Sequence, residues 1–280
     1  MGMSFLAFMN PESKLCLSLG VLRKDPVEFW DRLHNFIEVR RDRLRAERRP
    51  QRTIHMGALI AALREKSNWD LNGPLQETAM EEIEHHVSRL ASGSDGNKHF
   101  DRLYDADLTL ARLCYAICRV LSPNAVVETG VANGVTTSFI LQALAQNGRG
   151  KLWSIDLPPI RPQADLCVGL FVPQELRANW ELGRGVSKRL LPSLLDRLHT
   201  VDLFIHDSLH TRLNMGWEFE AVWPHLRPGG VLIADDVQSQ PAFLNFVSKT
   251  HPFFSAIVTE KSKSAAFGMV VKANENIALS

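Results

Sequence analysis

Short apolar runs alternate with helical stretches along the chain after residue 100. The apolar runs that read as strands lie at 125–128, 152–156, 180–183, 201–206 and 230–235. Stretches with apolar residues at helical spacing separate most of them, at 136–147, 187–198 and 213–225. Near-continuous apolar strands that alternate with helices are typical of a parallel sheet covered on both faces. The pattern therefore predicts an α/β fold.

The end of the chain departs from this alternation. Two more strand-like runs, 255–260 and 266–272, follow each other closely. A parallel crossover needs about a dozen residues or more, so this short separation predicts an antiparallel hairpin. Together the runs predict a seven-stranded, mostly parallel sheet that ends in a C-terminal hairpin.

The first hundred residues carry helical signals instead. Asp25, Pro26 and Glu28 occupy the N-cap, first and third positions of a predicted helix. Its apolar residues recur at helical spacing and define one face: Val27, Trp30, Leu33, Phe36, Ile37 and Leu44. We expect this face to pack over the acceptor side of the sheet or to form a homo-oligomer contact. Thr78 and Glu81 begin a second helix with another capping box.

A polar, glycine-containing stretch at 91–98 suggests a boundary between the two patterns. We predict a helical N-terminal extension over 1–99 and an α/β domain over 100–280.

Composition and charge exclude several partners and locations. The net charge is +1 and 45% of the residues are hydrophobic, so the bulk of the chain is neither disordered nor generally attracted to nucleic acid or anionic membranes. The arginine-rich run from Arg40 to Arg52 lacks interleaved aromatic residues for base stacking. No apolar run approaches the ~20 residues that span a bilayer. The apolar N-terminus lacks the basic segment of a signal peptide, and four cysteines make no disulfide framework, which favours a cytoplasmic protein.

A glycine-containing turn follows the first predicted strand of the sheet. Gly130 and Gly134 allow close approach of a ligand to the backbone, and the following helix offers free N–H donors. Asp156 ends the next strand, where a carboxylate can accept hydrogen bonds from ribose hydroxyls. A dinucleotide fingerprint would have a glycine at Ala132. The sequence therefore predicts an adenosine cofactor and disfavours a dinucleotide.

Polar residues also follow the fourth and fifth predicted strands. His206, Asp207 and His210 come from the fourth, and Asp235 and Asp236 from the fifth. Ligands of open α/β sheets bind at the carboxyl ends of the strands, so we expect these side chains to converge. Carboxylates held close together repel one another, and a hard divalent cation such as Mg²⁺ relieves that repulsion.

At these motifs the stretch from Phe100 to Lys272 resembles the class I, Rossmann-like methyltransferases that use S-adenosylmethionine (SAM), in particular the group of macrolide-sugar O-methyltransferases and cephalosporin-hydroxylase-like proteins. The turn at 128–134 resembles their motif I. The resemblance implies cofactor contacts at these positions: Glu128, Thr129, Gly130, Asn133, Gly134, Asp156, Ser187 and His206. A helix N-cap explains Ser187 equally well.

The same resemblance implies a catalytic centre. Asp207, Asp235 and Asp236 are the implied ligands of Mg²⁺, and His210 is the implied general base. The group often has Glu-Asp where this chain has Asp235-Asp236, and the shorter Asp235 makes Asp236 the safer ligand. The implied reaction is metal-assisted O-methylation of a small hydroxylated molecule.

Other interpretations remain open. One is a nucleotide-cofactor oxidoreductase or hydroxylase on a similar sheet, and another is a SAM-binding subunit without catalysis. The acid and histidine cluster at Glu81, Glu82, Glu84, His85 and His86 contains only half of a di-iron pattern, so a solvated helix face is the better interpretation. The acceptor cannot be predicted, because acceptor pockets are formed by variable loops.

Overall fold

The computed structural model describes residues 14–44, 51–92, 108–161, 163–239, 241–259 and 265–274. The N-terminal segment 1–13, the middle of the arginine-rich run and most of the predicted boundary at 91–98 lie outside the described residues.

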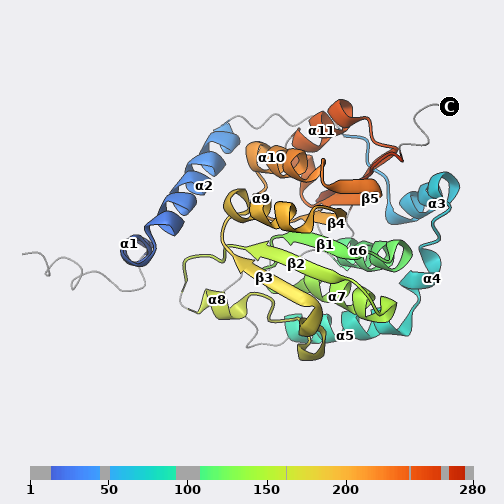
Figure 1. Ribbon diagram of the computed structural model, residues 1–280, viewed down its shortest axis with the longest axis horizontal. Helices are drawn as coiled ribbons and strands as arrows, with labels where there is room; N and C mark the ends of the chain where they lie inside the picture. Colours follow the sequence, from blue (N-terminus) through green and yellow to red (C-terminus); the bar gives the residue numbers. More distant parts are fainter. Residues whose placement is uncertain are drawn as a thin grey trace, which may run out of the picture.

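A seven-stranded sheet forms the centre of the molecule (Figure 1). Its strands are β1 (Ala125–Thr129), β2 (Lys151–Asp156), β3 (Trp180–Arg184), β4 (Val201–His206), β5 (Leu226–Ala234), β6 (Phe254–Thr259) and β7 (Ala266–Val271). Their order across the sheet is β3-β2-β1-β4-β5-β7-β6. Strands β1 to β5 pair in parallel, and β7 pairs antiparallel with both β5 and β6. The predicted α/β fold and its C-terminal hairpin are confirmed.

Strand β5 begins four residues before the predicted start at 230. Val201 pairs with Leu226 and Leu203 pairs with Val231, so the register shifts between the two pairs. The Arg227-Pro228-Gly229-Gly230 segment, which reads as a turn in the sequence, is an irregularity within this strand. Proline and glycine in a strand mark such bulges.

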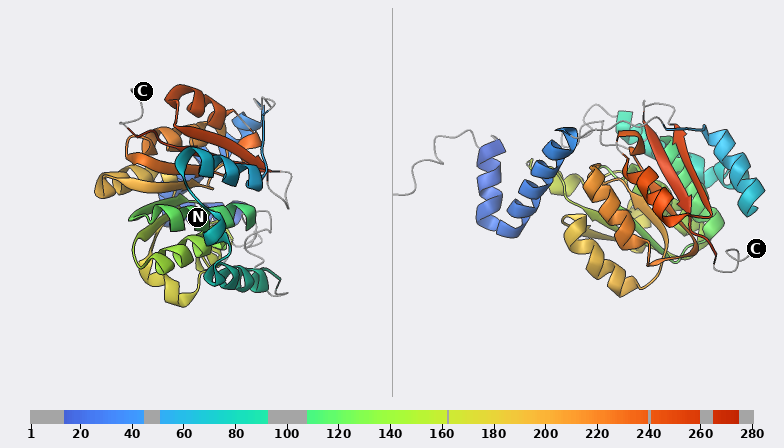
Figure 2. Two further views of the ribbon diagram at one scale, coloured as in Figure 1. Left: turned by 90° about the vertical axis from the view of Figure 1, so that its right-hand side faces the viewer. Right: turned by 90° about the horizontal axis from the view of Figure 1, so that it is seen from above.

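Helices cover both faces of the sheet, as Figures 1 and 2 show. The helical segments with described bounds are α1 (Lys14–Lys24), α2 (Pro26–Leu44), α3 (Met56–Ser67), α4 (Asn72–Leu75), α5 (Thr78–Ser92), α6 (Leu108–Leu121), α7 (Val135–Asn147), α8 (Ala164–Cys167), η3 (Gln174–Asn179), α9 (Ser187–Leu198), α10 (Arg212–Val222), η4 (Val237–Ser239) and α11 (Ala242–Thr250). None of the described helices is long and apolar enough to cross a bilayer.

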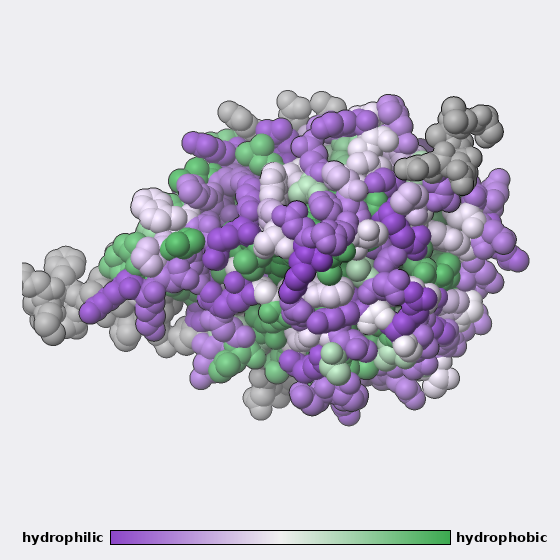
Figure 3. Space-filling model, viewed as in Figure 1, coloured by the Kyte–Doolittle hydropathy of each residue, from purple (hydrophilic) through white to green (hydrophobic). Residues whose placement is uncertain are grey.

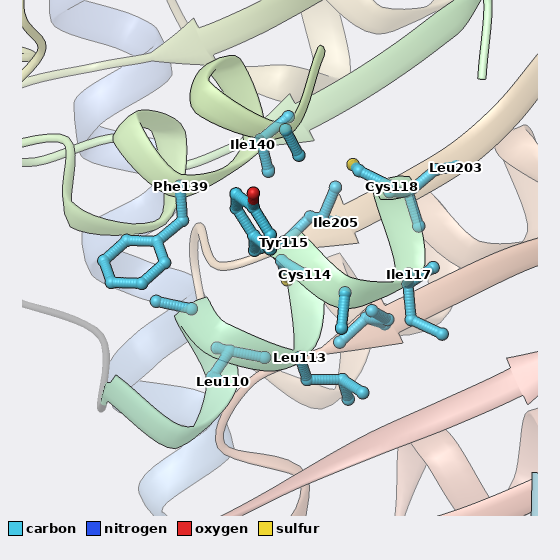
Figure 4. Close-up of a cluster of buried hydrophobic side chains, with 14 of the residues drawn as sticks. Leu110, Leu113, Cys114, Tyr115, Ile117, Cys118, Phe139, Ile140, Leu203 and Ile205 are labelled. Atoms are coloured by element: carbon cyan, nitrogen blue, oxygen red, sulfur yellow. The ribbon is translucent and has the colours of Figure 1, made fainter. Parts of the chain in front are cut away.

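The core on one side of the sheet includes residues from both sides of the predicted boundary. Leu59 of α3 and Ile83 of α5 belong to the same buried cluster as α6, α7 and the strands. Figure 4 shows the centre of this cluster, where Cys114 and Ile117 of α6 lie among side chains of α7 and β4. In addition, Ile54 pairs with Val258 at the sheet edge. Residues 51–92 therefore share the core of the sheet.

Helix α2 does not pack its apolar face over the sheet, and the predicted alternative, a homo-oligomer contact through this face, stays a prediction. Its N-cap is confirmed, because Asp25 Oδ1 accepts a hydrogen bond from the Glu28 backbone N–H at 2.9 Å. The Glu28 side chain instead pairs with Arg32 and Arg184 and does not close the reciprocal half of a capping box. Most of the predicted apolar face stays exposed, with Trp30 at 54% exposure and Leu44 at 87%. Hydrophobic residues accordingly reach the surface around α2 in Figure 3.

Candidate active site

A cavity of about 480 Å³ opens at the carboxyl edge of the parallel strands. The loops after all five parallel strands contribute to its wall. The lining residues that bear on its chemistry are Asn35, Gly130, Val131, Ala132, Asp156, Ser187, Asp207, Ser208, His210, Asn214, Asp235 and Asp236. This volume is in the usual range for small-molecule sites.

Gly130 forms the closest approach between two of these loops. Its φ is +89°, and a Cβ atom built there would lie 1.9 Å from the carbonyl oxygen of Asp207. Only glycine fits this position, both for its conformation and for its space. Gly134, with φ +86°, is the N-cap of α7. A Cβ atom at Gly134 would meet Gly169 and Val172, and the cavity lining includes no residue of α7.

Asp156 organises the turn from the neighbouring strand. Its Oδ2 accepts hydrogen bonds from the backbone N–H groups of Val131 at 2.6 Å and Ala132 at 2.9 Å. Burial raises the pKa of the Asp156 carboxyl, although these two hydrogen bonds oppose the shift. Asp156 also lines the cavity. The expected bond to a ribose hydroxyl stays a prediction.

Glu128 lies beneath the turn and does not line the cavity. It is buried, and its Oε2 accepts hydrogen bonds from the hydroxyls of Thr137 at 2.8 Å and Ser154 at 2.7 Å. Burial raises its pKa to about 8, with the two hydroxyl bonds opposing. Its position supports the shape of the turn.

A second buried carboxylate, Glu218 of α10, was not foreseen from the sequence. Its Oε2 accepts from Thr129 Oγ1 at 2.6 Å and lies 2.7 Å from His206 Nδ1. Its Oε1 accepts from Ser208 Oγ at 2.8 Å and Asn214 Nδ2 at 3.0 Å. Thr129 and His206 are thus turned toward α10 and lie below the cavity. A glutamate four residues after Asn214, between Trp217 and Phe219, is the only sequence signal for it.

Three of the predicted catalytic residues form a close group. Asp207, His210 and Asp235 each offer a ligand atom, and these atoms lie within 4.8 Å of one another. His210 Nε2 and Asp235 Oδ1 are buried and have no hydrogen-bond partner among the described residues. His210 Nε2 lies 3.4 Å from Asp207 Oδ1. The described residues contain no other such group of histidine, cysteine and acidic side chains.

Asp236 contacts the other ring nitrogen of His210. Its Oδ2 lies 2.8 Å from His210 Nδ1, and its Oδ1 accepts from Gln238 Nε2 at 3.2 Å. Asp236 has φ +53°, a conformation uncommon for a non-glycine residue. Burial disfavours the imidazolium of His210, but the neighbouring carboxylates of Asp207 and Asp236 outweigh it and raise the pKa of His210 to about 10.

The structure separates the predicted site residues into two sets. The residues that line the cavity are Gly130, Asp156, Ser187, Asp207, His210, Asp235 and Asp236. The residues that the cavity lining does not include are Glu128, Thr129, Asn133, Gly134 and His206. All five residues of this second set are buried. Their predicted contact with a cofactor remains a prediction.

Asn35 of α2 lines the cavity and was missed. Helical spacing indicates which residues of α2 share a side, but not which side faces the sheet. The predicted solvated face of α5 is consistent with Glu81 and His85 being exposed, while Glu84 pairs with Arg112.

The chain is similar to known methyltransferases in part of its sequence and in its fold. Residues 127–237 match a family model described as "Methyltransferase domain". The O-methyltransferase from Bacillus cereus, solved in complex with S-adenosylhomocysteine (SAH), has a TM-score of 0.51 at 14% identity and covers 77% of this chain and 97% of its own. The O-methyltransferase TomG from Streptomyces achromogenes, involved in tomaymycin synthesis and solved with SAM, has a TM-score of 0.50 at 15% identity. The match covers 75% of this chain and 99% of TomG. No curated protein sequence matches this chain. At these identities the structural likeness establishes the fold.

Proposed function

We propose that this chain is a SAM-dependent methyltransferase that transfers the methyl group of SAM to a hydroxyl oxygen of a small molecule. One observation carries the proposal. A glycine turn held by Asp156 and a close group of Asp207, His210 and Asp235 line the same cavity.

The cofactor side of the cavity suits SAM. The turn at Gly130 presents backbone to the cavity, and the Asp156 carboxylate lies beside it. A tight turn without the middle glycine of the dinucleotide fingerprint favours a cofactor that has no pyrophosphate. The bound SAH and SAM of the two similar structures support the same choice.

The group of Asp207, His210 and Asp235 suits a divalent cation. Two carboxylates and an imidazole are ordinary metal ligands, and two of their buried atoms lack a hydrogen-bond partner within the described part of the chain. Asp207 and Asp235 would hold Mg²⁺ through hard oxygen ligands. When bound, the cation would lower the pKa of an acceptor hydroxyl. Asp236 is not in the close group, so its proposed role changes from ligand to partner of His210.

His210 is the proposed proton acceptor. Asp236 fixes its ring through Nδ1, which leaves Nε2 facing Asp207 and the cavity. An imidazole oriented by a carboxylate is a common arrangement for a general base. Without a cation the neighbouring carboxylates hold the pKa of His210 at about 10, and a cation on Asp207 and Asp235 would lower it toward the neutral ring that a base requires. The same Nε2 could serve as a third metal ligand, and the two roles exclude each other because Nδ1 is already engaged.

The acceptor class follows from the chemistry of the group. A base and a cation beside one another suit an alcohol, a diol or a catechol, and we propose a small hydroxylated molecule as the partner. The net charge of +1 gives no support to nucleic acid or membrane partners.

The experiment combines binding with activity. SAH should raise the melting temperature of the protein more than NAD does, because a ligand of the folded state stabilises it by mass action. Labelled SAM should then methylate members of a panel of alcohols, sugars and catechols in the presence of Mg²⁺. A larger shift with NAD would overturn the methyltransferase assignment to SAM, and full activity after exhaustive EDTA treatment would overturn the metal.

A further inference from the structure

Helix α2 presents a line of carboxylates to the α/β domain. Glu28, Asp31, Glu38 and Asp42 lie on one side of the helix, and we call them the acidic stripe. Asn35 lies within the stripe and lines the cavity. Figure 1 shows α2 beside the sheet, close to α9, and Figure 2 shows that α1 and α2 project from the body of the molecule.

Every member of the stripe has a partner on the domain. Glu28 pairs with Arg184 at the end of β3, and Asp31 pairs with Arg189 of α9 at 2.9 Å. Glu38 pairs with Lys188 at 2.5 Å and accepts from the Thr211 hydroxyl. Asp42 accepts from the backbone N–H of Arg212 at 3.1 Å. These partners flank the cavity from β3 to the start of α10.

The contact with α2 explains the two cations at the start of α9. Lys188 and Arg189 are the second and third residues of α9. Cations are disfavoured there, because the N-terminal end of a helix carries a partial positive charge. Asp31 and Glu38 supply the compensating negative charge. The charges of α9 are therefore matched to the acidic stripe.

The attachment of α2 is polar and not hydrophobic. Its apolar residues Trp30, Phe36 and Leu44 are half or more exposed, so hydrophobic burial contributes little to its attachment. In these ion pairs the cationic side chains are 37–45% exposed and the carboxylates only 5–19%, so salt reaches each pair from the side of the cation and weakens it. Segments held in this way open at a lower free energy than the packed core.

From these contacts we propose that α2 is a removable wall of the ligand cavity: the acidic stripe holds it in place, and Asn35 contacts the bound ligand. The proposal rests on the proposed function only in taking SAH as the ligand. Among the hydrogen bonds found between described residues, none uses the Asn35 side chain. Its amide can therefore donate to or accept from a ligand in the cavity. Opening of α2 would admit and release the ligand, as lids do in other enzymes.

The first experiment tests the wall without any ligand. Hydrogen exchange of the amides at 26–44 is compared in 0.1 M and 1 M NaCl, where the screening length falls from about 10 Å to about 3 Å. Exchange should accelerate at high salt, by up to about 5-fold for each ion pair of the stripe that is screened. Exchange in α6 should not change. Salt-independent exchange of α2 would overturn the polar attachment, whether or not the protein binds SAH.

The second experiment uses exchanged charges on the full chain. Glu38→Lys and Lys188→Glu each place like charges together, and the double variant restores an opposite pair. Stopped-flow measurement should show faster SAH dissociation in both single variants and recovery in the double variant, as expected for coupled residues. Glu220→Lys on α10, which disrupts the remote pair with Lys249, is the matched control and should bind SAH as the parent does. Unchanged dissociation in the single variants, or no recovery in the double variant, would contradict the proposal.

Asn35→Ala tests the contact itself. Loss of one hydrogen bond should weaken SAH binding by about 2- to 10-fold in calorimetry. Ligand-free exchange of α2 should stay as in the parent, because the acidic stripe is intact. Parent-like SAH affinity in Asn35→Ala would show that α2 does not contact the cofactor. If the parent protein itself binds no SAH, the proposed cofactor fails, and the salt experiment still decides whether α2 is a removable wall.

Discussion

Helices α6 and α2 are held to the same sheet by different forces. Leu113, Cys114 and Ile117 of α6 are fully buried among apolar side chains of α7 and the strands. Helix α2 turns its carboxylates inward and leaves Trp30 and Leu44 exposed. Hydrophobic burial does not weaken with added salt, whereas exposed ion pairs do. The comparison separates a permanent part of the fold from a segment that can leave it.

The largest expected effect concerns catalysis at the edge of the sheet, in the firmly packed part of the fold. His210→Ala should lower turnover by ~10²–10⁴-fold if His210 is the general base. SAH binding should be nearly unchanged, because the glycine turn and Asp156 remain. Turnover and SAH affinity are measured on the same preparation. Retained turnover would remove the base role, and a loss of Mg²⁺ affinity would instead assign His210 Nε2 to the metal.

The next effect compares the two helices directly. Ile117→Ala should lower the free energy of unfolding by about 2–5 kcal/mol, because a fully buried side chain is lost and a cavity remains. Trp30→Ala on α2 removes a larger but half-exposed side chain and should change it by about 0.5 kcal/mol or less. Urea unfolding followed by circular dichroism measures both. Equal losses would show that α2 is packed as firmly as α6.

Buried and paired carboxylates should respond to pH in opposite directions. The raised pKa of Glu128, about 8, means that the folded state keeps a proton that the unfolded chain loses above about 4.5. The free energy of unfolding should therefore fall as the pH rises through this window, by at most about 1.4 kcal/mol per pH unit. Glu128→Gln should flatten that fall, because it keeps an oxygen for Thr137 and Ser154 but cannot ionise. A slope identical to that of the parent would place the titration elsewhere.

Glu28 on α2 has the reverse sign. Burial opposes its ionisation, but hydrogen bonds to Arg184 and Arg32 outweigh this and lower its pKa. Its contribution is present above the ordinary pKa of a glutamate and is lost as the pH falls through the lowered value. Acid should thus loosen the attachment of α2, whereas rising pH should lower the free energy of unfolding of the core that contains Glu128.

The smallest expected effect is local to α2. Asp25→Ala removes the N-cap acceptor of the Glu28 N–H and should cost this helix about 0.5–2 kcal/mol. Because α2 opens apart from the core, the melting temperature should stay within error while hydrogen exchange at 26–44 accelerates. A clear drop in melting temperature would instead couple α2 to global unfolding.

The sheet was predictable because periodicity is a local property. Apolar runs of strand length marked all seven strands, and the rule on carboxyl ends placed Asp207, His210 and Asp235 at one edge. The start of β5 was not predicted, because the register shift near Val201 depends on how β5 pairs with β4. The roles of the individual acids at this edge were harder to assign. Asp236 lies outside the close group of Asp207, His210 and Asp235, and its position depends on its positive φ, which the sequence does not reveal.

The remaining features arise from tertiary contacts. Glu218 gathers Thr129, His206 and Ser208 from strand ends and loops that lie far apart in the sequence. The apolar face of α2 does not cover the sheet, and the alternative, a homo-oligomer contact through this face, stays a prediction. A helix with an apolar side and an acidic side can dock through either. The cations at the start of α9 decide between them, and their importance appears only once α2 lies beside them.

The contact between Gly130 and the Asp207 carbonyl has a thermodynamic consequence. The two loops touch so closely that not even a methyl group fits between them, and Asp207 N donates to Thr129 O at 2.7 Å beside the same contact. A ligand that fixes the loop at Gly130 must also fix the backbone of Asp207, and a cation on Asp207 must fix the turn. Coupling between two binding sites is reciprocal, so each should raise the affinity of the other by the same factor. We therefore expect cooperative binding of SAH and Mg²⁺.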